Sequence, residues 1–227
     1  MTRQRLMAIE TTADVATLAL TDGETVWHEA VTTPGAHAAD LMQRVNHLFA
    51  SSALEPRELD GIVYGQGPGS FTGVRIGIAL AQGLAHAANL PMQGICSLRN
   101  RAAQLTTVTA SAVTIAIDAR MGEYYVARFS AGDWQPLAPP ALAGVEGFVP
   151  PPGDALAGNA LCVDVTLAQR SRAGGAQVIT EGLEPDARTA LRLVAQRWHP
   201  PEAATASYVR DKVADKPGER SSKPQVL

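Results

Sequence analysis

Two carboxylates occupy matching positions in the sequence, each at the end of an apolar run that is typical of a strand. Glu10 lies in "LMAIETTADVATLAL" (6–20) and Asp118 in "TIAIDARMGEYYVARF" (114–129), and each acid is followed by a short turn and another strand-like run. The two acids lie about half the chain apart, so the pattern indicates two similar halves. Facing carboxylates could hold Mg²⁺ with a nucleotide; alternatively, they make only structural hydrogen bonds at strand ends.

A glycine-rich stretch, "GQGPGSFTGVRIGIALAQGLA" (65–85), offers a second place for chemistry. A strand, a glycine loop and a helix in this order can bind an anion at the helix N-terminus. The stretch has neither the lysine of a P-loop nor the third glycine of a dinucleotide fingerprint. It therefore predicts only a weak anion site, formed by Gly67, Gly69, Ser70 and Thr72.

Histidines and cysteines are too scattered for the usual metal or redox motifs. The sequence has no H-E-x-x-H or H-x-x-x-H pair and no G-x-S-x-G nucleophile elbow. His37 and His47 share a predicted helix, but ten helical residues separate them by about 15 Å, too far to bind one ion. Cys96 and Cys162 are expected to be inert thiols in a reducing compartment. We predict no catalytic residue and no metal site.

The elements that must position these residues follow from the periodicity of apolar side chains. Apolar runs predict an antiparallel meander and a later strand, at 5–10, 15–20, 25–31 and 59–65. An i, i+3, i+4, i+7 pattern predicts a helix over 36–50, with Thr33 and Pro34 suited to its start. The later part is less patterned, with helices predicted at 97–107 and 185–198, a proline-rich loop at 131–153 and a disordered tail at 211–227.

The segment 72–88 is predicted to be a helix that is apolar nearly all round. From residue 73 its strongly polar residues are Arg75, Gln82 and His86, which share one narrow stripe. Such a helix must be buried on more than one side. Either it is a central core helix, or its small residues allow a second subunit to pack closely against it.

Composition limits the classes of function. The chain has 227 residues, a net charge of −3 and a pI near 5.9, so tight independent binding to nucleic acid is not expected. The N-terminal apolar run, about four residues long, is too short for a signal peptide or a membrane span. We therefore expect a cytoplasmic protein that does not contact membranes.

Several segments together resemble the TsaB (YeaZ) family. The glycine-rich stretch with the following "LP" (90–91) resembles the family signature, and "AIDARMGEYY" (116–125) resembles its second motif. "YVRDKVADK" (208–216) is similar to its C-terminal segment, and the opening "AIET" and His37 also fit. The match runs in order along most of the chain and is weakest at 131–200. Glu10 replaces the usual aspartate, which argues against a nucleotide–metal role there, and "ASYVR" lacks the usual proline.

The resemblance implies a fold of the α/β class: a two-lobed actin-like ATPase (ribonuclease H-like) fold with duplicated βββαβα halves. We expect an N-terminal lobe at 1–107 that carries the dimerisation helices 36–50 and 72–88, a C-terminal lobe at 108–210 and the tail at 211–227. The residues expected near a bound nucleotide or anion are Glu10, Gly67, Gly69, Ser70, Thr72 and Asp118.

The resemblance also implies a function. Members are non-catalytic dimerisation or scaffold subunits of the complex that transfers a threonylcarbamoyl group to N6 of adenosine 37, in tRNAs that read codons starting with A. The implied partners are the transferase TsaD, the ATPase TsaE, a second copy when the protein is alone, and tRNA only through the complex. ATP or ADP with Mg²⁺ would bind at the complex interface. TsaD carries an H-x-x-x-H metal motif, whereas here "GICSL" is followed by "RNRAA".

The predicted partner interface lies on the two dimerisation helices and consists of His37, Leu41, Arg75, Ile76, Ala79, Leu80 and Gly83. Two other functions remain as alternatives. An independent nucleotide-binding ATPase would need a site between Glu10, the 65–73 loop and Asp118. A glycoprotease-like peptidase would need metal ligands that the sequence lacks.

Overall fold

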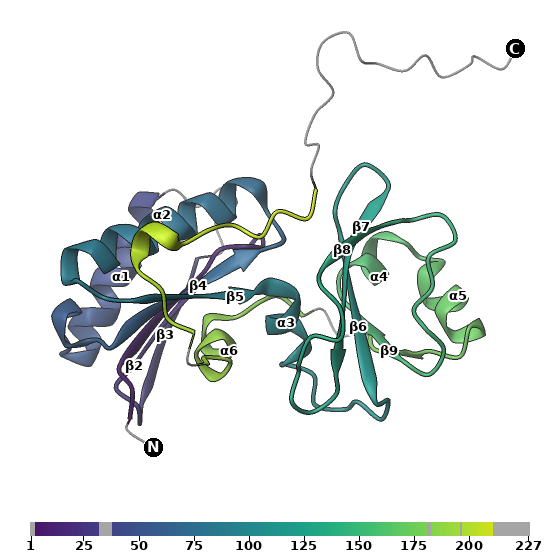
Figure 1. Ribbon diagram of the computed structural model, residues 1–227, viewed down its shortest axis with the longest axis horizontal. Coiled ribbons are helices and arrows are strands. Elements are labelled where there is room, and N and C mark those ends of the chain that lie inside the picture. Colours follow the sequence, from purple (N-terminus) through teal and green to yellow (C-terminus); the bar gives the residue numbers. More distant parts are fainter. Residues whose placement is uncertain (1–2, 32–37, 181–182, 196, 211–227) are drawn as a thin grey trace, which may run out of the picture.

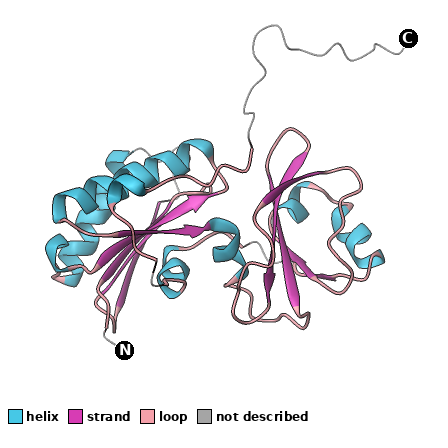
Figure 2. Cartoon of the chain, in the orientation of Figure 1, coloured by secondary structure: helices cyan, strands magenta, loops and turns pink. Residues whose placement is uncertain are grey.

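The computed structural model describes residues 3–31, 38–180, 183–195 and 197–210. These residues form two lobes that lie side by side, each built on a five-stranded sheet (Figure 1). Helices pack on the sheets of both lobes, and long loops connect several elements of the second lobe (Figure 2). The expected α/β fold class with two lobes is confirmed.

The first lobe has its strands in the order β3-β2-β1-β4-β5. The central strand β1 (Leu6–Glu10) is antiparallel to β2 (Ala16–Thr21) and parallel to β4 (Gly61–Gly67). The edge strands are β3 (Val26–Val31) and β5 (Met92–Cys96). Every residue of β1 and β2 is buried, which explains why these strands are nearly continuous apolar runs. The predicted meander is confirmed.

Two helices cover one face of this sheet, α1 (Ala38–Ser52) and α2 (Phe71–Ala88), and a 3₁₀ turn (Pro56–Glu58) follows α1 (Figure 1). Their buried rows follow the helical period: Leu41, Val45 and Leu48 from α1, and Val74, Ile78, Ala81 and Ala85 from α2. Both predicted helices are therefore present. Thr33 and Pro34, predicted to start α1, lie outside the described residues, as does His37.

The opposite face of the first sheet is covered by the far end of the chain. Helix α6 (Ala187–Arg192) packs in one cluster with small and branched residues of the sheet, namely Ala8, Ala19, Val63 and Ile95. The expected second unit, 108–210, thus ends in a segment that contacts the first sheet. Sequence order alone could not reveal this return.

Two helices are shorter than the sequence predicts. Instead of spanning 185–198, α6 ends before Leu193, and the chain then turns so that His199 pairs with Met92 of β5. Their backbone groups exchange two hydrogen bonds of 2.8 and 2.9 Å, which a continuing helix could not form. Helix α3 (Ser97–Ala102), predicted over 97–107, ends where the chain leaves the first lobe.

The second lobe repeats the topology of the first, with its strands in the order β10-β9-β6-β7-β8. The centre is β6 (Ala112–Asp118), antiparallel to β7 (Glu123–Ser130) and parallel to β9 (Ala155–Ala157). The remaining elements are β8 (Ala141–Gly144), α4 (Ala160–Val163), α5 (Leu167–Ala173) and β10 (Gln177–Val178). Both β1 and β6 therefore end in the carboxylates that suggested the repeat.

The repeat departs from the expected βββαβα pattern between β8 and β9. No helix joins β8 to β9, although α1 occupies the equivalent position in the first lobe. Residues 150–152 are three successive prolines, which lack the N–H groups of a helix interior and clash with the preceding turn. The connection is therefore a loop, as its composition predicts, whereas β8 lies inside the region predicted to be loop.

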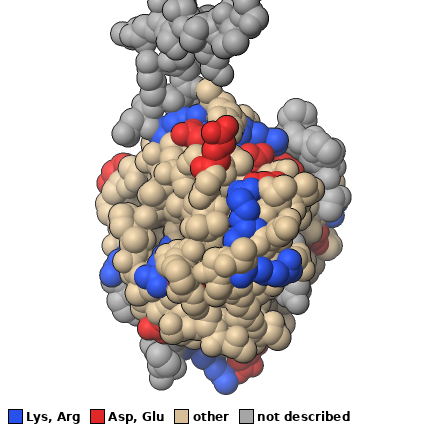
Figure 3. Space-filling model, turned by 90° about the vertical axis from the view of Figure 1, so that its right-hand side faces the viewer, with Lys and Arg blue, Asp and Glu red and all other residues tan. Residues whose placement is uncertain are grey.

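The surface carries little concentrated charge on the end of the second lobe. Most of this face is uncharged, and acidic and basic side chains lie beside one another near its top (Figure 3). Within the described ranges, no helix combines the length and the apolar character that crossing a bilayer requires.

Candidate functional site

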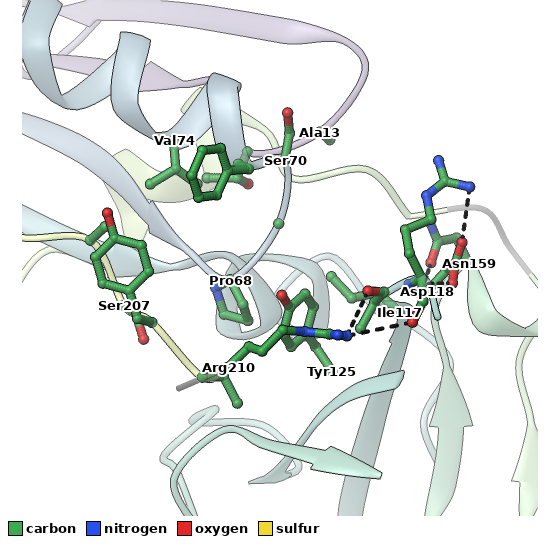
Figure 4. Close-up of a pocket in the computed structure, with 18 of the residues that line it drawn as sticks. Ala13, Pro68, Ser70, Val74, Ile117, Asp118, Tyr125, Asn159, Ser207 and Arg210 are labelled. Atoms are coloured by element: carbon green, nitrogen blue, oxygen red, sulfur yellow. Dashed lines mark hydrogen bonds and ion pairs between the residues drawn. The ribbon is translucent and has the colours of Figure 1, made fainter. Parts of the chain in front are cut away.

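A cavity of about 420 Å³ lies between the two lobes. Its lining comes from the β1–β2 turn (12–14), residues between 68 and 75, the β6–β7 turn (117–121) and the C-terminal segment 206–210. Ala13, Ser70 and Val74 approach it from the first lobe, whereas Ile117, Asp118 and Asn159 approach it from the second (Figure 4). The two turns that follow the repeated carboxylates thus meet at one place.

Of the two repeated carboxylates, Asp118 lines this cavity. Its Oδ1 accepts a 2.8 Å hydrogen bond from the backbone N–H of Arg120, and Oδ2 lies 3.2 Å from the Arg120 guanidinium. The Asp118 N–H donates to Oδ1 of Asn159 at 2.9 Å. The carboxylate is therefore held at the edge of the cavity by its own turn.

Glu10 lies beneath the cavity instead of lining it. Its side chain is fully buried, and Oε1 accepts a 2.8 Å hydrogen bond from the N–H of Thr12. A Cβ at Gly65 would lie 2.4 Å from that oxygen, so any larger residue where β4 passes the carboxyl group would force the Glu10 side chain to shift. Burial raises the pKa of Glu10, although Thr12 and Arg101 act in the opposite direction. The structure does not bring Glu10 to the cavity surface beside Asp118.

The glycine-rich loop is shaped mainly by contact with the β1–β2 turn. A Cβ at Gly69 would lie 2.1 Å from the carbonyl oxygen of Thr12, and Ser70 donates its N–H to that oxygen at 2.8 Å. The hydroxyl of Ser70 caps α2 by accepting a hydrogen bond from Gly73 N–H. Gly69 and Ser70 line the cavity, whereas Gly67 and Thr72 do not. A nucleotide or anion at these residues stays a prediction.

A buried arginine at the base of the cavity was missed by the sequence reasoning. Arg101 is 2% exposed, and its Nε donates to the Leu183 carbonyl at 2.9 Å while Nη2 contacts Glu184 at 3.1 Å. Burial lowers its pKa, opposed by Glu184 and Glu10. Nothing in "SLRNRA" distinguishes this arginine from the half-buried Arg99, because the partners of Arg101 lie more than eighty residues away.

Three large exposed side chains gather at the mouth of the cavity. Phe71, Tyr208 and Met121 are 55%, 59% and 79% exposed and all line it. The Arg75 guanidinium lies 3.4 Å from the centroid of the Phe71 ring and 5.2 Å from that of Tyr208. Arg75, expected at a partner interface, therefore already contacts aromatic rings of its own chain.

The other predicted interface residues separate into exposed and buried groups. Ala79 and Gly83 are exposed on the outer face of α2, and Ile76 and Leu80 are half-buried against the core. Leu41 is 1% exposed and supports α1 from within the core, which corrects the expectation that it meets a partner directly. His37 lies outside the described residues.

The glycines of α2 differ in the reason for their presence. A Cβ at Gly73 would lie 2.0 Å from the Thr11 carbonyl oxygen, and one at Gly77 would lie 2.1 Å from Thr11 Oγ1. A Cβ at Gly83 would have no atom of the described residues within 4 Å. Glycine inside a helix costs about 1 kcal/mol relative to alanine. Contacts within this chain explain the first two glycines but not Gly83.

Metal-ligating side chains do not gather in the described part of the chain. No group of three or more His, Cys, Asp or Glu residues there is placed to hold an ion. Cys96 is half-buried and Cys162 is exposed, and both are free thiols.

Comparison with known proteins relates residues 32–209 to the family described as "TsaD: tRNA N6-adenosine threonylcarbamoyltransferase". The chain is 40% identical over 126 residues to the tRNA threonylcarbamoyladenosine biosynthesis protein TsaB of Escherichia coli (strain K12), covering 55% of this chain and 54% of that protein. For TsaB of Bacillus subtilis (strain 168), the identity is 34% over 121 residues, 53% of this chain and 52% of that protein. Each match thus spans about half of the curated relative.

Solved structures extend the likeness over most of the chain. YeaZ from Pseudomonas aeruginosa superposes with a TM-score of 0.79 at 27% sequence identity. The superposition covers 90% of this chain and 99% of that structure, so both lobes are included.

Proposed function

The chain belongs to the tRNA N6-adenosine threonylcarbamoyltransferase family, within its TsaB/YeaZ group, and we propose that it is an accessory subunit in the synthesis of N6-threonylcarbamoyladenosine in tRNA. In this role it binds and positions a catalytic subunit and does not itself transfer the group. The names of the relatives support the pathway. The chain also lacks the H-x-x-x-H pair that the resemblance assigns to the transferase.

The observation that carries a partner-binding role is the outer face of α2. Ala79 and Gly83 lie one helical turn apart on this exposed face, flanked by the half-buried Ile76 and Leu80. A stripe of small and apolar side chains lets the backbone of a second helix approach closely. Gly83, for which the described part of the chain offers no internal reason, fits such a contact.

The partner proposed for this face is a TsaD-type transferase subunit, with a second copy of this chain on the same face when the partner is absent. An ATPase of the TsaE type and tRNA would join through the assembled complex. The isolated chain has a net charge of −3, which supports contact with tRNA through the complex instead of through this chain alone.

Ala79→Glu tests the interface directly. The new carboxylate would be buried without a partner in the complex but exposed in the isolated chain, so we expect loss of co-elution with the transferase subunit and an unchanged melting temperature. Ala173→Glu, at an exposed alanine of α5 in the second lobe, is the matched control and should co-elute normally. Leu80 is less suitable because it packs against its own core. Normal co-elution of Ala79→Glu would refute the proposed interface.

Incorporation of labelled threonine into tRNA tests the pathway. In a reconstituted mixture, we expect incorporation to require this protein together with the transferase and to be absent with this protein alone. The Ala79→Glu variant should lower incorporation, whereas Ala173→Glu should not. Full incorporation in the absence of this protein would contradict the accessory role.

A further inference from the structure

The C-terminal segment 199–207 is bound firmly to the first lobe. Its anchors begin with the two backbone hydrogen bonds between His199 and Met92. The Gln82 side chain then donates to the Pro201 carbonyl at 2.8 Å, and Ser207 N–H donates to the Gln66 carbonyl at 2.7 Å. Ala204 and Ala206 add apolar contacts to the core of the first lobe.

Three residues later the same segment reaches the second lobe through one side chain, Arg210. Its Nη2 lies 2.6 Å from the Glu123 carboxylate and donates to the Ala119 carbonyl at 3.0 Å, and Nη1 lies 3.1 Å from the sulfur of Met121. The side chain is only 14% exposed. Figure 4 shows it crossing the lower part of the cavity toward the β6–β7 turn.

The turn that receives Arg210 has an unusual backbone. Arg120 and Met121 have φ values of +62° and +57°, in the left-handed region that residues with a side chain seldom adopt. A guanidinium that binds the carbonyl of Ala119 and the carboxylate of Glu123 holds the two ends of this turn. The contact therefore orders the turn as well as joining the lobes.

Elsewhere the chain itself connects the lobes, after α3 and before α6, and Leu98 and Ala102 of α3 pack in the core of the second lobe (Figure 1). Hydrogen bonds tie these two connections together: Arg101 and Asn100 of α3 contact Leu183 and Asp186. In Figure 1 the yellow segment that ends at residue 210 crosses between the lobes away from these connections. The connections can thus act as a hinge, and the C-terminal segment spans the opposite side of the cavity.

We propose that residues 199–210 form a strap across the cavity and that Arg210 is its latch. The strap has several anchors on the first lobe but is held to the second by one arginine, so its release requires loss of the Arg210 contacts. When the latch is released, the second lobe rotates about the two chain connections. The cavity mouth, which residues 206–210 help to line, then widens.

The distance between spin labels on the two lobes tests the latch. In a Cys96→Ala background, one label is placed on the natural Cys162 of α4 and the other on an introduced Gln43→Cys in α1, both exposed positions. For the natural latch we expect one narrow distance distribution. Arg210→Ala should broaden it and shift it to longer distances, and an unchanged distribution would overturn the proposal.

Arg170→Ala is the matched control. Arg170 also contacts a carboxylate, Asp164 at 2.9 Å, and a backbone carbonyl, Val145 at 3.3 Å, but all three residues belong to the second lobe. This variant should leave the interlobe distance unchanged. A shift as large as that of Arg210→Ala would show a general loss of order and would overturn the assignment of a specific latch.

Two further measurements distinguish loss of the Arg210 contact from a general loss of folding. Glu123→Gln removes the charge that faces Arg210 but keeps the side-chain shape, and it should shift the distribution in the same direction. High salt screens the pair, so it should broaden the distribution of the natural protein but leave that of Arg210→Ala unaltered. If neither treatment changes the distance, Arg210 is not a latch.

Discussion

In the second lobe, the buried phenol of Tyr124 donates a 2.8 Å hydrogen bond to Asp164. The same carboxylate receives Arg170 at 2.9 Å and the hydroxyl and N–H of Thr166. Arg170 and these hydroxyl donors hold the pKa of Asp164 well below its usual range. Burial and then the hydrogen bond to Asp164 raise the pKa of Tyr124 to about 12. Asp164 thus favours the neutral phenol of Tyr124, and Tyr124 favours the ionised carboxylate of Asp164.

This pair predicts a loss of stability in alkali. The unfolded phenol titrates near pH 10, whereas the folded one has a pKa of about 12, so between these values the folded state binds more protons. The contribution of this pair to the free energy of unfolding should therefore be complete below pH 10. Above it, we expect a fall that approaches about 1.4 kcal/mol per pH unit.

Chemical denaturation of the natural protein and of Tyr124→Phe, from pH 8 to 12, measures this dependence. The phenylalanine variant lacks the titrating group, so its stability should fall less steeply over pH 10–12. Other tyrosines and lysines titrate in both proteins and cancel in the comparison. Parallel curves for the two proteins would show that Tyr124 titrates normally in the folded state.

At the level of elements, the two faces of α2 differ in what they contact. Its inner face meets the β1–β2 turn so closely that Thr11 leaves no room for a side chain at Gly73. The Thr11 hydroxyl also donates to the Gly73 carbonyl at 2.7 Å, which fixes the helix start to the turn. On the outer face, a Cβ at Gly83 would meet no atom of the described residues within 4 Å. Helical periodicity predicts α2 but does not distinguish these two kinds of glycine.

The contrast predicts opposite effects of alanine at the two positions. Gly83→Ala should stabilise the isolated chain by about 0.5–1 kcal/mol, because alanine is the better helix former and has open space. Gly73→Ala should destabilise it by about 1–3 kcal/mol, because its Cβ would overlap the Thr11 carbonyl. Urea denaturation measures both effects.

The same pair tests the partner surface. If another helix packs against Gly83, its alanine variant should bind the transferase subunit more weakly although the isolated chain is more stable. A variant that is more stable and binds equally well would mean that Gly83 lies outside the interface.

At the scale of the whole molecule, the chain builds the first lobe from two distant segments. The strands and helices up to α3 form the sheet and cover one face, and residues 187–207 return from the second lobe to cover the other face and edge. Trp198 contributes to this return, since a Cβ at Gly61 would lie 2.6 Å from its ring. The first lobe is therefore complete only after the second has been traversed.

This arrangement predicts that fragment 1–107 will not fold cooperatively by itself. Without α6, the buried sheet residues Ala8, Ala19, Val63 and Ile95 would be exposed to water. We expect no sharp thermal transition in circular dichroism and a tendency to aggregate. Joining residues 183–210 to the fragment through a flexible linker should restore the transition. A cooperative transition in fragment 1–107 alone would contradict this account.

Local sequence patterns predict the kinds of elements and their repeat. Strand and helix periods, helix start residues and the matching turns after Glu10 and Asp118 act over a few residues, so they are visible without a fold. Together with the motif resemblance, they were sufficient for the two-lobed architecture. The prolines at 150–152 also indicate locally that no helix forms between β8 and β9, although the repeat pattern predicts one there.

Which of these residues meet depends on the folded arrangement of distant segments. Asp118 lies at the cavity while Glu10 is buried beneath it, Arg101 is buried by partners more than eighty residues away, and the segment 187–210 returns to bridge both lobes. Such contacts depend on how distant segments dock, and an arginine or a carboxylate has the same local spacing whether it becomes buried or exposed. For this reason the elements could be predicted, whereas the cavity and its strap could not.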